Sequence, residues 1–205
     1  MVVHDVDRAA RPSLPQRWWN HITLCCVKVP SGSAEAPTTN GSPPYRLIQE
    51  LLELYPSRSA VPHDVWRRLI AGTREALDVL IYAGTFLFEQ HQLGDVVREK
   101  ARDGVRFRIL LGDETATAVR LRAKEEGTAG GLEGRIQLHR RYLRGVLGLP
   151  GVEVRTHGTT LYNSLFRFDQ DLLVNGHAYG AVAGQSPVLH LRRVPGGLFI
   201  SRKEE

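Results

Sequence analysis

Residues that can transfer protons or act as nucleophiles gather in one polar stretch of this 205-residue chain, between residues 156 and 180. The candidates within it are His157, His177, Tyr162, Ser164 and Asp169. Such groups support acid–base or covalent catalysis when the fold brings them within hydrogen-bonding reach. The commoner role of a lone histidine is to satisfy backbone groups at the end of a strand. The stretch is therefore the first place to look for a site.

Several familiar kinds of site do not fit this pattern. His157, His177 and His190 lack the i, i+4 spacing of a helical metal motif, and no cysteine follows Cys26, so we expect no metal. The Gly-x-Ser-x-Gly sequence that exposes a nucleophilic serine is absent around Ser164. The glycines of residues 127–134 do not follow an expected strand, so they form neither a P-loop nor a dinucleotide motif. We accordingly expect no cofactor.

Helical and strand patterns alternate around this stretch. Apolar spacing predicts helices over 44–54, from His63 onward to Leu77 or Leu80, and over 91–103, 115–125 and 133–148. Short apolar or alternating runs predict strands at 79–88, 105–111, 152–156, 162–169, 172–175 and 188–194, with a hairpin turn at 169–171. Helical crossovers between strands predict an α/β fold, a mixed sheet with a parallel centre flanked by helices.

The ends of the parallel strands are where ligands bind in such sheets. That rule selects Gly84-Thr85, Gly112-Asp113 and His157-Gly158. Asp113 can present a carboxylate to a ligand there, although Gly-Asp is also an ordinary turn. We include Asp113 among the candidate ligand-binding residues.

The N-terminal part of the chain differs from the rest in composition. Residues 1–44 hold six of the eleven prolines, and residues 30–44 are almost all proline or small and polar residues. Such a segment has little to bury in a core. We predict a Pro-rich, disordered tail over 1–44, a folded domain over 45–200 and a charged end over 201–205.

Three features predict a cytoplasmic protein with no membrane partner. No apolar run approaches the roughly 18–20 residues that a membrane span needs. The first residues lack the basic-then-apolar order of a secretory signal. Cys25 and Cys26 are neighbours in sequence and are unsuited to a structural disulfide, as in a reducing compartment.

The basic excess is modest, at a formal net charge of +5, and only four of the 27 basic residues are lysines. One basic cluster has a tyrosine, Tyr142, interleaved: Arg135, His139, Arg140, Arg141, Arg144 and Arg155. A nucleic-acid surface would explain this cluster, but a solvated helix face explains it as well, and we favour the second interpretation. Direct DNA binding would make the affinity fall steeply with salt.

The order of elements from residue 79 resembles one half of a phospholipase-D-like, or HKD, domain. That superfamily carries His-x-Lys-x4-Asp followed by Gly-Ser. Aligned on Asp169, Tyr162 takes the place of the histidine and Ser164 that of the lysine, while Gly176 matches the glycine and His177 replaces the serine. The resemblance implies a phospholipase-D-like half-domain with degenerate catalytic residues.

A closer resemblance is to a domain found behind Cro/C1-type (XRE) helix-turn-helix modules in bacterial transcriptional regulators. It rests on residues 55–62, 81–84, 105–113, 161–169, 173–180 and 183–195. No helix-turn-helix is recognisable before residue 45. The resemblance implies a regulatory role and a helix-turn-helix partner, or DNA contacted indirectly through one.

The altered motif argues against standard phosphodiesterase chemistry. In an active HKD enzyme the histidine attacks phosphorus and the lysine neutralises phosphate oxygens, whereas a tyrosine phenol (pKa about 10) stays protonated and a serine brings no charge. On a regular strand, Tyr162 and Ser164 share one face, and Arg167 and Asp169 share the other. Arg167 is therefore expected to pair with Asp169. The single motif would also require a homodimer.

We accordingly expect a non-catalytic, ligand-sensing domain that binds an anionic or nucleotide-like small molecule. The candidate ligand-binding residues are Asn163, Ser164, Arg167, Asn175, His177 and Asp113. The alternative is a divergent phosphodiesterase or phosphotransferase that acts through His157 or His177 with Asp169. That alternative requires these histidines, Tyr162 and Asp169 to converge on one cavity.

Overall fold

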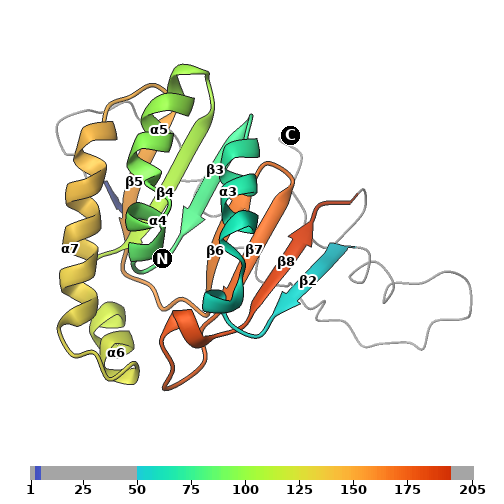
Figure 1. The fold of residues 1–205 in the computed structure, drawn as a ribbon. Coiled ribbons are helices and arrows are strands. Elements are labelled where there is room, and N and C mark those ends of the chain that lie inside the picture. Colours follow the sequence, from blue (N-terminus) through green and yellow to red (C-terminus); the bar gives the residue numbers. More distant parts are fainter. Residues whose placement is uncertain (1–2, 6–49, 195–205) are drawn as a thin grey trace, which may run out of the picture.

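The computed structural model describes residues 3–5 and 50–194 of the chain, and these form one mixed sheet with helices packed against it (Figure 1). The eight strands are β1 (Val3–Asp5), β2 (Leu51–Tyr55), β3 (Ala76–Leu80), β4 (Arg106–Gly112), β5 (Val152–His157), β6 (Asn163–Phe168), β7 (Asp171–Gly176) and β8 (Val188–Arg192). Their order in the sheet is β1-β5-β4-β3-β6-β7-β8-β2. Only the β3–β4 and β4–β5 pairings are parallel. The predicted α/β fold with a parallel centre is confirmed.

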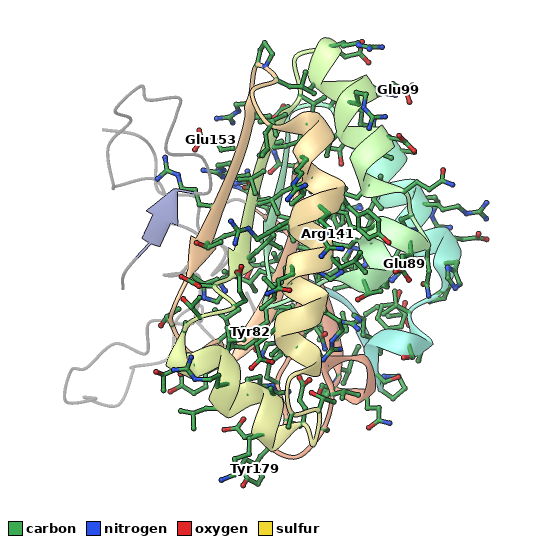
Figure 2. All side chains as sticks on the ribbon, turned by 90° about the vertical axis from the view of Figure 1, so that its left-hand side faces the viewer. Tyr82, Glu89, Glu99, Arg141, Glu153 and Tyr179 are labelled. Carbon is green, nitrogen blue, oxygen red and sulfur yellow. The ribbon has the colours of Figure 1, made fainter. Side chains whose placement is uncertain are left out.

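Helices pack against residues from both faces of the sheet. They are α3 (His63–Gly72), α4 (Thr85–Glu89), α5 (Leu93–Arg102), α6 (Thr117–Glu125) and α7 (Gly131–Leu143). In Figure 1, α3, α4 and α5 lie in front of the strands, and Figure 2 shows the same layers from the side of α7. Because β3 is central and covered, all five of its residues are buried, as in strands packed on both faces.

Two apolar clusters hold these layers together. The first joins Val79, Ile109 and Phe166 of the sheet to Trp66 of α3 and Val97 of α5. The second joins strand residues that point to the other face to α6 and α7, and includes Leu80, Leu110, Leu165, Val119 and Ile136. None of the described helices is long and apolar enough to cross a membrane.

The helix predicted over 44–54 is wrong from Leu51 onward, since Leu51–Tyr55 is strand β2. Leu51 and Leu54 have helical spacing, but β2 pairs antiparallel with β8, where Leu54 lies opposite Leu189. The open edge of β8 offers backbone hydrogen bonds that a local helix cannot provide to the sheet. A partner more than 130 residues away in sequence thus overrides the local pattern.

The predicted boundary between the second helix and the first long strand is also wrong. Helix α3 ends at Gly72, β3 covers Ala76–Leu80 rather than 79–88, and α4 begins at Thr85. The cause lies in Asp169, whose carboxylate accepts the backbone N–H groups of Arg74 (2.7 Å), Glu75 (2.9 Å) and Ala76 (2.8 Å). Those groups are therefore not available to continue the helix, and the chain turns into the sheet.

The other elements agree with the sequence to within a few residues. Helices α5, α6 and α7, strands β4 to β8 and the hairpin turn at Asp169 are confirmed, although α7 ends at Leu143 and a short 3-10 turn (Arg144–Val146) follows it. The predicted tail lies outside the described residues except for Val3–Asp5, which pair antiparallel with β5. The predicted charged end, 201–205, also lies outside them.

Replacing Asp169 is expected to destabilise the fold. Asp169→Ala removes an acceptor for three backbone N–H groups and places alanine at φ = 50°, where L-residues are strained. We expect a loss of about 2–3 kcal/mol in the free energy of unfolding, measured by urea denaturation. Asp169→Asn keeps one acceptor oxygen and tolerates positive φ, so its loss should be smaller. Equal stability of Asp169→Ala and the wild type would contradict this role.

Candidate functional site

The carboxyl edge of the parallel strands brings together most of the candidate residues. Strand β5 ends there at His157. Because β6 runs antiparallel to β3, with Leu165 opposite Leu80, the first residues of β6 lie beside the end of β3. Ser164 is paired with Asn175 of β7, and His177 follows just beyond. The sheet topology thus gathers His157, Ser164, Asn175 and His177.

The ring of Tyr82, in the loop after β3, lies next to two of these histidines. Its centroid is 5.5 Å from that of His157 and 5.7 Å from that of His177, whose ring is inclined to it by only 24°. The Tyr82 hydroxyl oxygen accepts the Leu161 N–H at 2.8 Å, and burial raises the pKa of the phenol. Gly112 permits this packing, because a Cβ there would lie 3.2 Å from the Tyr82 ring and carbonyl oxygen.

Ser164 and His177 form a hydrogen-bonded pair whose proton positions follow from their partners. His177 Nδ1 lies 3.1 Å from the Leu161 carbonyl oxygen, which can only accept, so Nδ1 carries the proton. Nε2 is then the acceptor for the Ser164 hydroxyl, 2.9 Å away. Burial, reinforced by the charge of Arg122, lowers the pKa of His177 to about 4. The ring is neutral at pH 7 and is a weak base.

Accessibility also argues against nucleophilic use of this pair. The Ser164 residue is only 3% exposed. His157 is completely buried; its Nε2 lies 3.2 Å from the Ile81 carbonyl oxygen, to which it donates. Burial lowers the pKa of His157 as well. Both histidines thus satisfy backbone carbonyl groups near strand ends.

Asp169 and Arg167 lie at the opposite edge of the sheet, far along β6 from Ser164. Arg167 Nε donates to the backbone oxygen of Asp169 at 3.0 Å, and Arg167 Nη1 lies 3.4 Å from the carboxylate of Asp78. The expected Arg167–Asp169 contact is present, but through a carbonyl oxygen. The structure therefore does not bring Asp169 to His157 or His177, and the geometry that the phosphodiesterase alternative requires is not present.

The remaining candidates have less direct roles. Tyr162 is 76% exposed, and its backbone oxygen accepts the His177 N–H at 2.8 Å. The Asp113 carboxylate accepts the N–H (2.9 Å) and the hydroxyl (2.7 Å) of Thr115, which closes a turn after β4. Asn163, at the start of β6, is opposite Gly176. Tyr162 and Asn163 border the histidine cluster, and Asp113 stabilises a nearby loop.

Arg58 is a second cation near this site, besides Arg122. It begins a 3-10 turn, Arg58–Ala60, in the loop after β2, and its guanidinium carbon lies 4.4 Å from the centroid of the Phe86 ring. The one hydrogen bond of its side chain within the described residues is long, 3.5 Å from Nη1 to Asn175 Oδ1. Burial lowers the pKa of Arg58 to about 10. Among the described residues no carboxylate lies within ion-pair distance of it.

The neighbouring charges leave Arg58 uncompensated. Arg122, which is buried, donates to Glu126 (2.9 Å) and Glu125 (3.4 Å). Glu126 also pairs with Arg135 at 3.3 Å, and from a longer distance it acts on Arg58. Three arginines, Arg58, Arg122 and Arg135, thus meet two glutamates, which leaves one positive charge in excess.

Several residues of the basic cluster around α7 form ion pairs or hydrogen bonds with other residues of the fold. His139 is completely buried, accepts the Gly84 N–H at 3.2 Å and stacks on Phe88. Arg140 pairs with Glu114, Arg135 with Glu126 and Arg155 with Glu153. The interpretation as a nucleic-acid surface thereby loses much of its unpaired charge.

No family model matches the chain, and no curated protein matches it. Among solved structures the chain is similar to that of TrmBL2, an archaeal chromatin protein whose structure shows a novel mode of DNA binding, with a TM-score of 0.42 and 11% sequence identity. The match covers 71% of this chain and 46% of that chain, so the chain spans less than half the length of that protein.

The buried histidines predict a loss of stability in acid. Burial lowers the pKa values of His139 and His177 to about 4, whereas a histidine of the unfolded chain titrates near 6.5. As the pH falls below about 6.5, the unfolded chain takes up protons that the folded chain takes up only near pH 4. Each histidine is expected to remove about 2–3 kcal/mol of stability across this range, measured by urea denaturation at each pH.

His177→Gln is expected to flatten this pH dependence by about the contribution of one histidine. The exposed His63 provides the matched control, because His63→Gln removes a histidine that is not enclosed by the fold. If His177→Gln retained the full acid loss while unfolding cooperatively, the assignment of a neutral, buried imidazole would be incorrect.

Proposed function

We propose that the chain is a non-catalytic, ligand-binding domain that takes up a small anionic molecule at the carboxyl edge of the sheet. The anion is held by Arg58, with Asn175 and the Ser164–His177 pair beside it. Four of the ligand-binding residues expected from the sequence belong to this proposed site: Asn163, Ser164, Asn175 and His177. Arg167 and Asp113 are not part of it, because they serve the opposite edge and a local turn.

The observation that carries the proposal is the half-buried guanidinium of Arg58, which has no carboxylate within ion-pair distance among the described residues. Burying a cation without a partner costs free energy, and a guanidinium offers five N–H donors in a planar fork. Arg58 uses one of them, weakly. An oxyanion such as a phosphate or a carboxylate would supply both the missing charge and the missing acceptors.

A binding role fits these residues better than catalysis does. A nucleophile must reach its substrate, whereas Ser164 is enclosed and its hydroxyl proton is directed to a weakly basic imidazole. The carboxylate that would complete a phosphodiesterase motif, Asp169, is fully occupied by backbone N–H groups. The resemblance to domains behind Cro/C1-type helix-turn-helix modules favours a regulatory consequence of binding, exerted on an attached or separate DNA-binding module.

Binding can be tested directly with two probes, inorganic phosphate and adenosine 5′-monophosphate, by isothermal titration calorimetry on the full chain. We expect the wild type to bind at least one of them and Arg58→Met to weaken that binding by at least about tenfold, because the charge-assisted hydrogen bonds are lost. Methionine retains much of the apolar stem over Phe86.

Arg141→Met is the matched control, since Arg141 is an exposed arginine of α7, and it should bind as the wild type does. Failure of the wild type to bind either probe would overturn the assignment of a phosphate-type anion. Equal losses in Arg58→Met and Arg141→Met would indicate nonspecific attraction to a basic protein.

In the absence of ligand, Arg58→Met is expected to stabilise the chain by about 1–2 kcal/mol. The substitution removes a desolvated charge without a carboxylate partner, and this gain exceeds the lost cation–π contact with Phe86. Urea denaturation at pH 7 in a buffer without oxyanions measures the difference. A clear destabilisation would mean that Arg58 stabilises the folded chain, and would contradict the assignment of its charge to ligand binding.

A further inference from the structure

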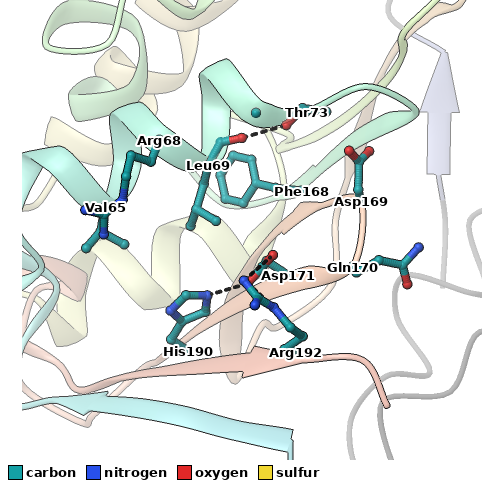
Figure 3. Close-up of a pocket in the computed structure, with 11 residues that line it drawn as sticks. Val65, Arg68, Leu69, Thr73, Phe168, Asp169, Gln170, Asp171, His190 and Arg192 are labelled. Atoms are coloured by element: carbon teal, nitrogen blue, oxygen red, sulfur yellow. Dashed lines mark hydrogen bonds and ion pairs between the residues drawn. The ribbon is translucent and has the colours of Figure 1, made fainter. Parts of the chain in front are cut away.

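A hollow lies at the opposite edge of the sheet from Arg58. Its volume is about 360 Å³, and it is open to one side between α3 and the ends of β6, β7 and β8. Figure 3 shows Val65 and Leu69 of α3 on one side and Asp171, His190 and Arg192 on the other. The volume lies within the range of small-molecule sites.

One wall of the hollow is apolar. It consists of Val65, Leu69 and the ring of Phe168. Val65 and Phe168 belong to the core, and Leu69 packs against that core. This wall is therefore rigid, and an apolar ligand body placed against it would remove further apolar surface from water.

The carboxylates that line the hollow already have their donors. Asp171 Oδ1 lies 2.8 Å from His190 Nε2 and 2.9 Å from Arg192 Nη2. Burial acts to raise the pKa of Asp171, but the hydrogen bonds from His190 and Arg192 outweigh it and hold that pKa below its usual value. Asp169 is occupied by three backbone N–H groups. Neither carboxylate needs a donor from a ligand.

The guanidinium of Arg68 has N–H donors that lack an acceptor among the described residues. Its side chain makes no hydrogen bond or ion pair with any described residue, while the neighbouring Arg67 pairs with Asp64. Arg192 directs Nε and Nη2 at Asp171. Among the described residues, the hydrogen-bonding groups of the hollow that remain unused are the Arg68 guanidinium and the side-chain amide of Gln170, and only Arg68 carries a charge.

From this arrangement we infer that the hollow binds an amphipathic carboxylate, a small molecule with an apolar body of about six to ten carbons. The body lies against Val65, Leu69 and Phe168, and the carboxylate accepts from Arg68. The planar guanidinium fork matches a carboxylate in two parallel hydrogen bonds. The site is separate from that of Arg58, because the two lie at opposite ends of the strands, and neither assignment depends on the other.

The test uses the full chain and three probes that separate the two requirements: phenylacetate, phenylethylamine with the same ring and the opposite charge, and acetate without the ring. Ligand-detected NMR and isothermal titration calorimetry measure binding. We expect phenylacetate to bind at least tenfold more tightly than either of the other two probes. Arg68→Met should weaken phenylacetate binding by at least about tenfold, and Arg67→Met, its neighbour on α3, should leave it unchanged.

Three results would overturn the inference: no binding of phenylacetate, equal binding of phenylethylamine, or equal effects of Arg67→Met and Arg68→Met. Both arginines are exposed, and circular dichroism with a thermal melt confirms that each variant folds. Arg58→Met must leave the preference for phenylacetate over acetate unchanged, because that preference belongs to the hollow, so the failure of one site is distinguishable from the failure of the other. Loss of phenylacetate binding in Arg58→Met alone would place the carboxylate at the carboxyl edge and contradict the second site.

Discussion

The two-sided pairing of strand β3 decides where most of the candidate residues lie. It runs parallel to β4 on one side and antiparallel to β6 on the other. The first pairing brings the ends of the parallel strands to one edge, and the second sends β6 back from that edge. Ser164 and His177 therefore meet His157 and Tyr82, while Asp169 is carried to the far edge. There its carboxylate binds the backbone at the start of β3 and fixes the same strand from its other end.

The balance of charge distinguishes the buried ionic groups that stabilise the fold from the one that we assign to ligand binding. Asp78 is buried in the middle of β3 but is met by Arg108 and Arg167, and Arg122 is met by two glutamates. Such pairs are satisfied and serve the fold. Arg58 at the carboxyl edge differs from these pairs, because no carboxylate of the described residues offsets the free-energy cost of partly burying its charge. Sites kept at a cost to stability are where a ligand is expected to contribute the missing interaction.

Sequence patterns predicted the fold well where the signal was local. The amphipathic spacing of α5, the apolar run of β4 and the turn at Asp169 all depend on neighbours in sequence, and the structure confirms them. The helix predicted at Leu51 failed because β2 depends on β8. Arg58 was visible only as part of the segment 55–62, since its partners, Phe86 and Asn175, follow 28 and 117 residues later. Tyr82 was expected inside a strand over 79–88, so its place in the loop after β3 emerges only from the structure.

The central claim is that an anion binds at the Arg58 guanidinium. The most direct test is to follow the arginine side-chain Nε–H resonances by NMR during a phosphate titration, with the Arg58 signal identified by its loss in Arg58→Met. The account predicts that the Arg58 resonance shifts saturably and further than that of any other arginine. A titration in which Arg58 stays fixed while exposed arginines such as Arg141 shift would contradict it.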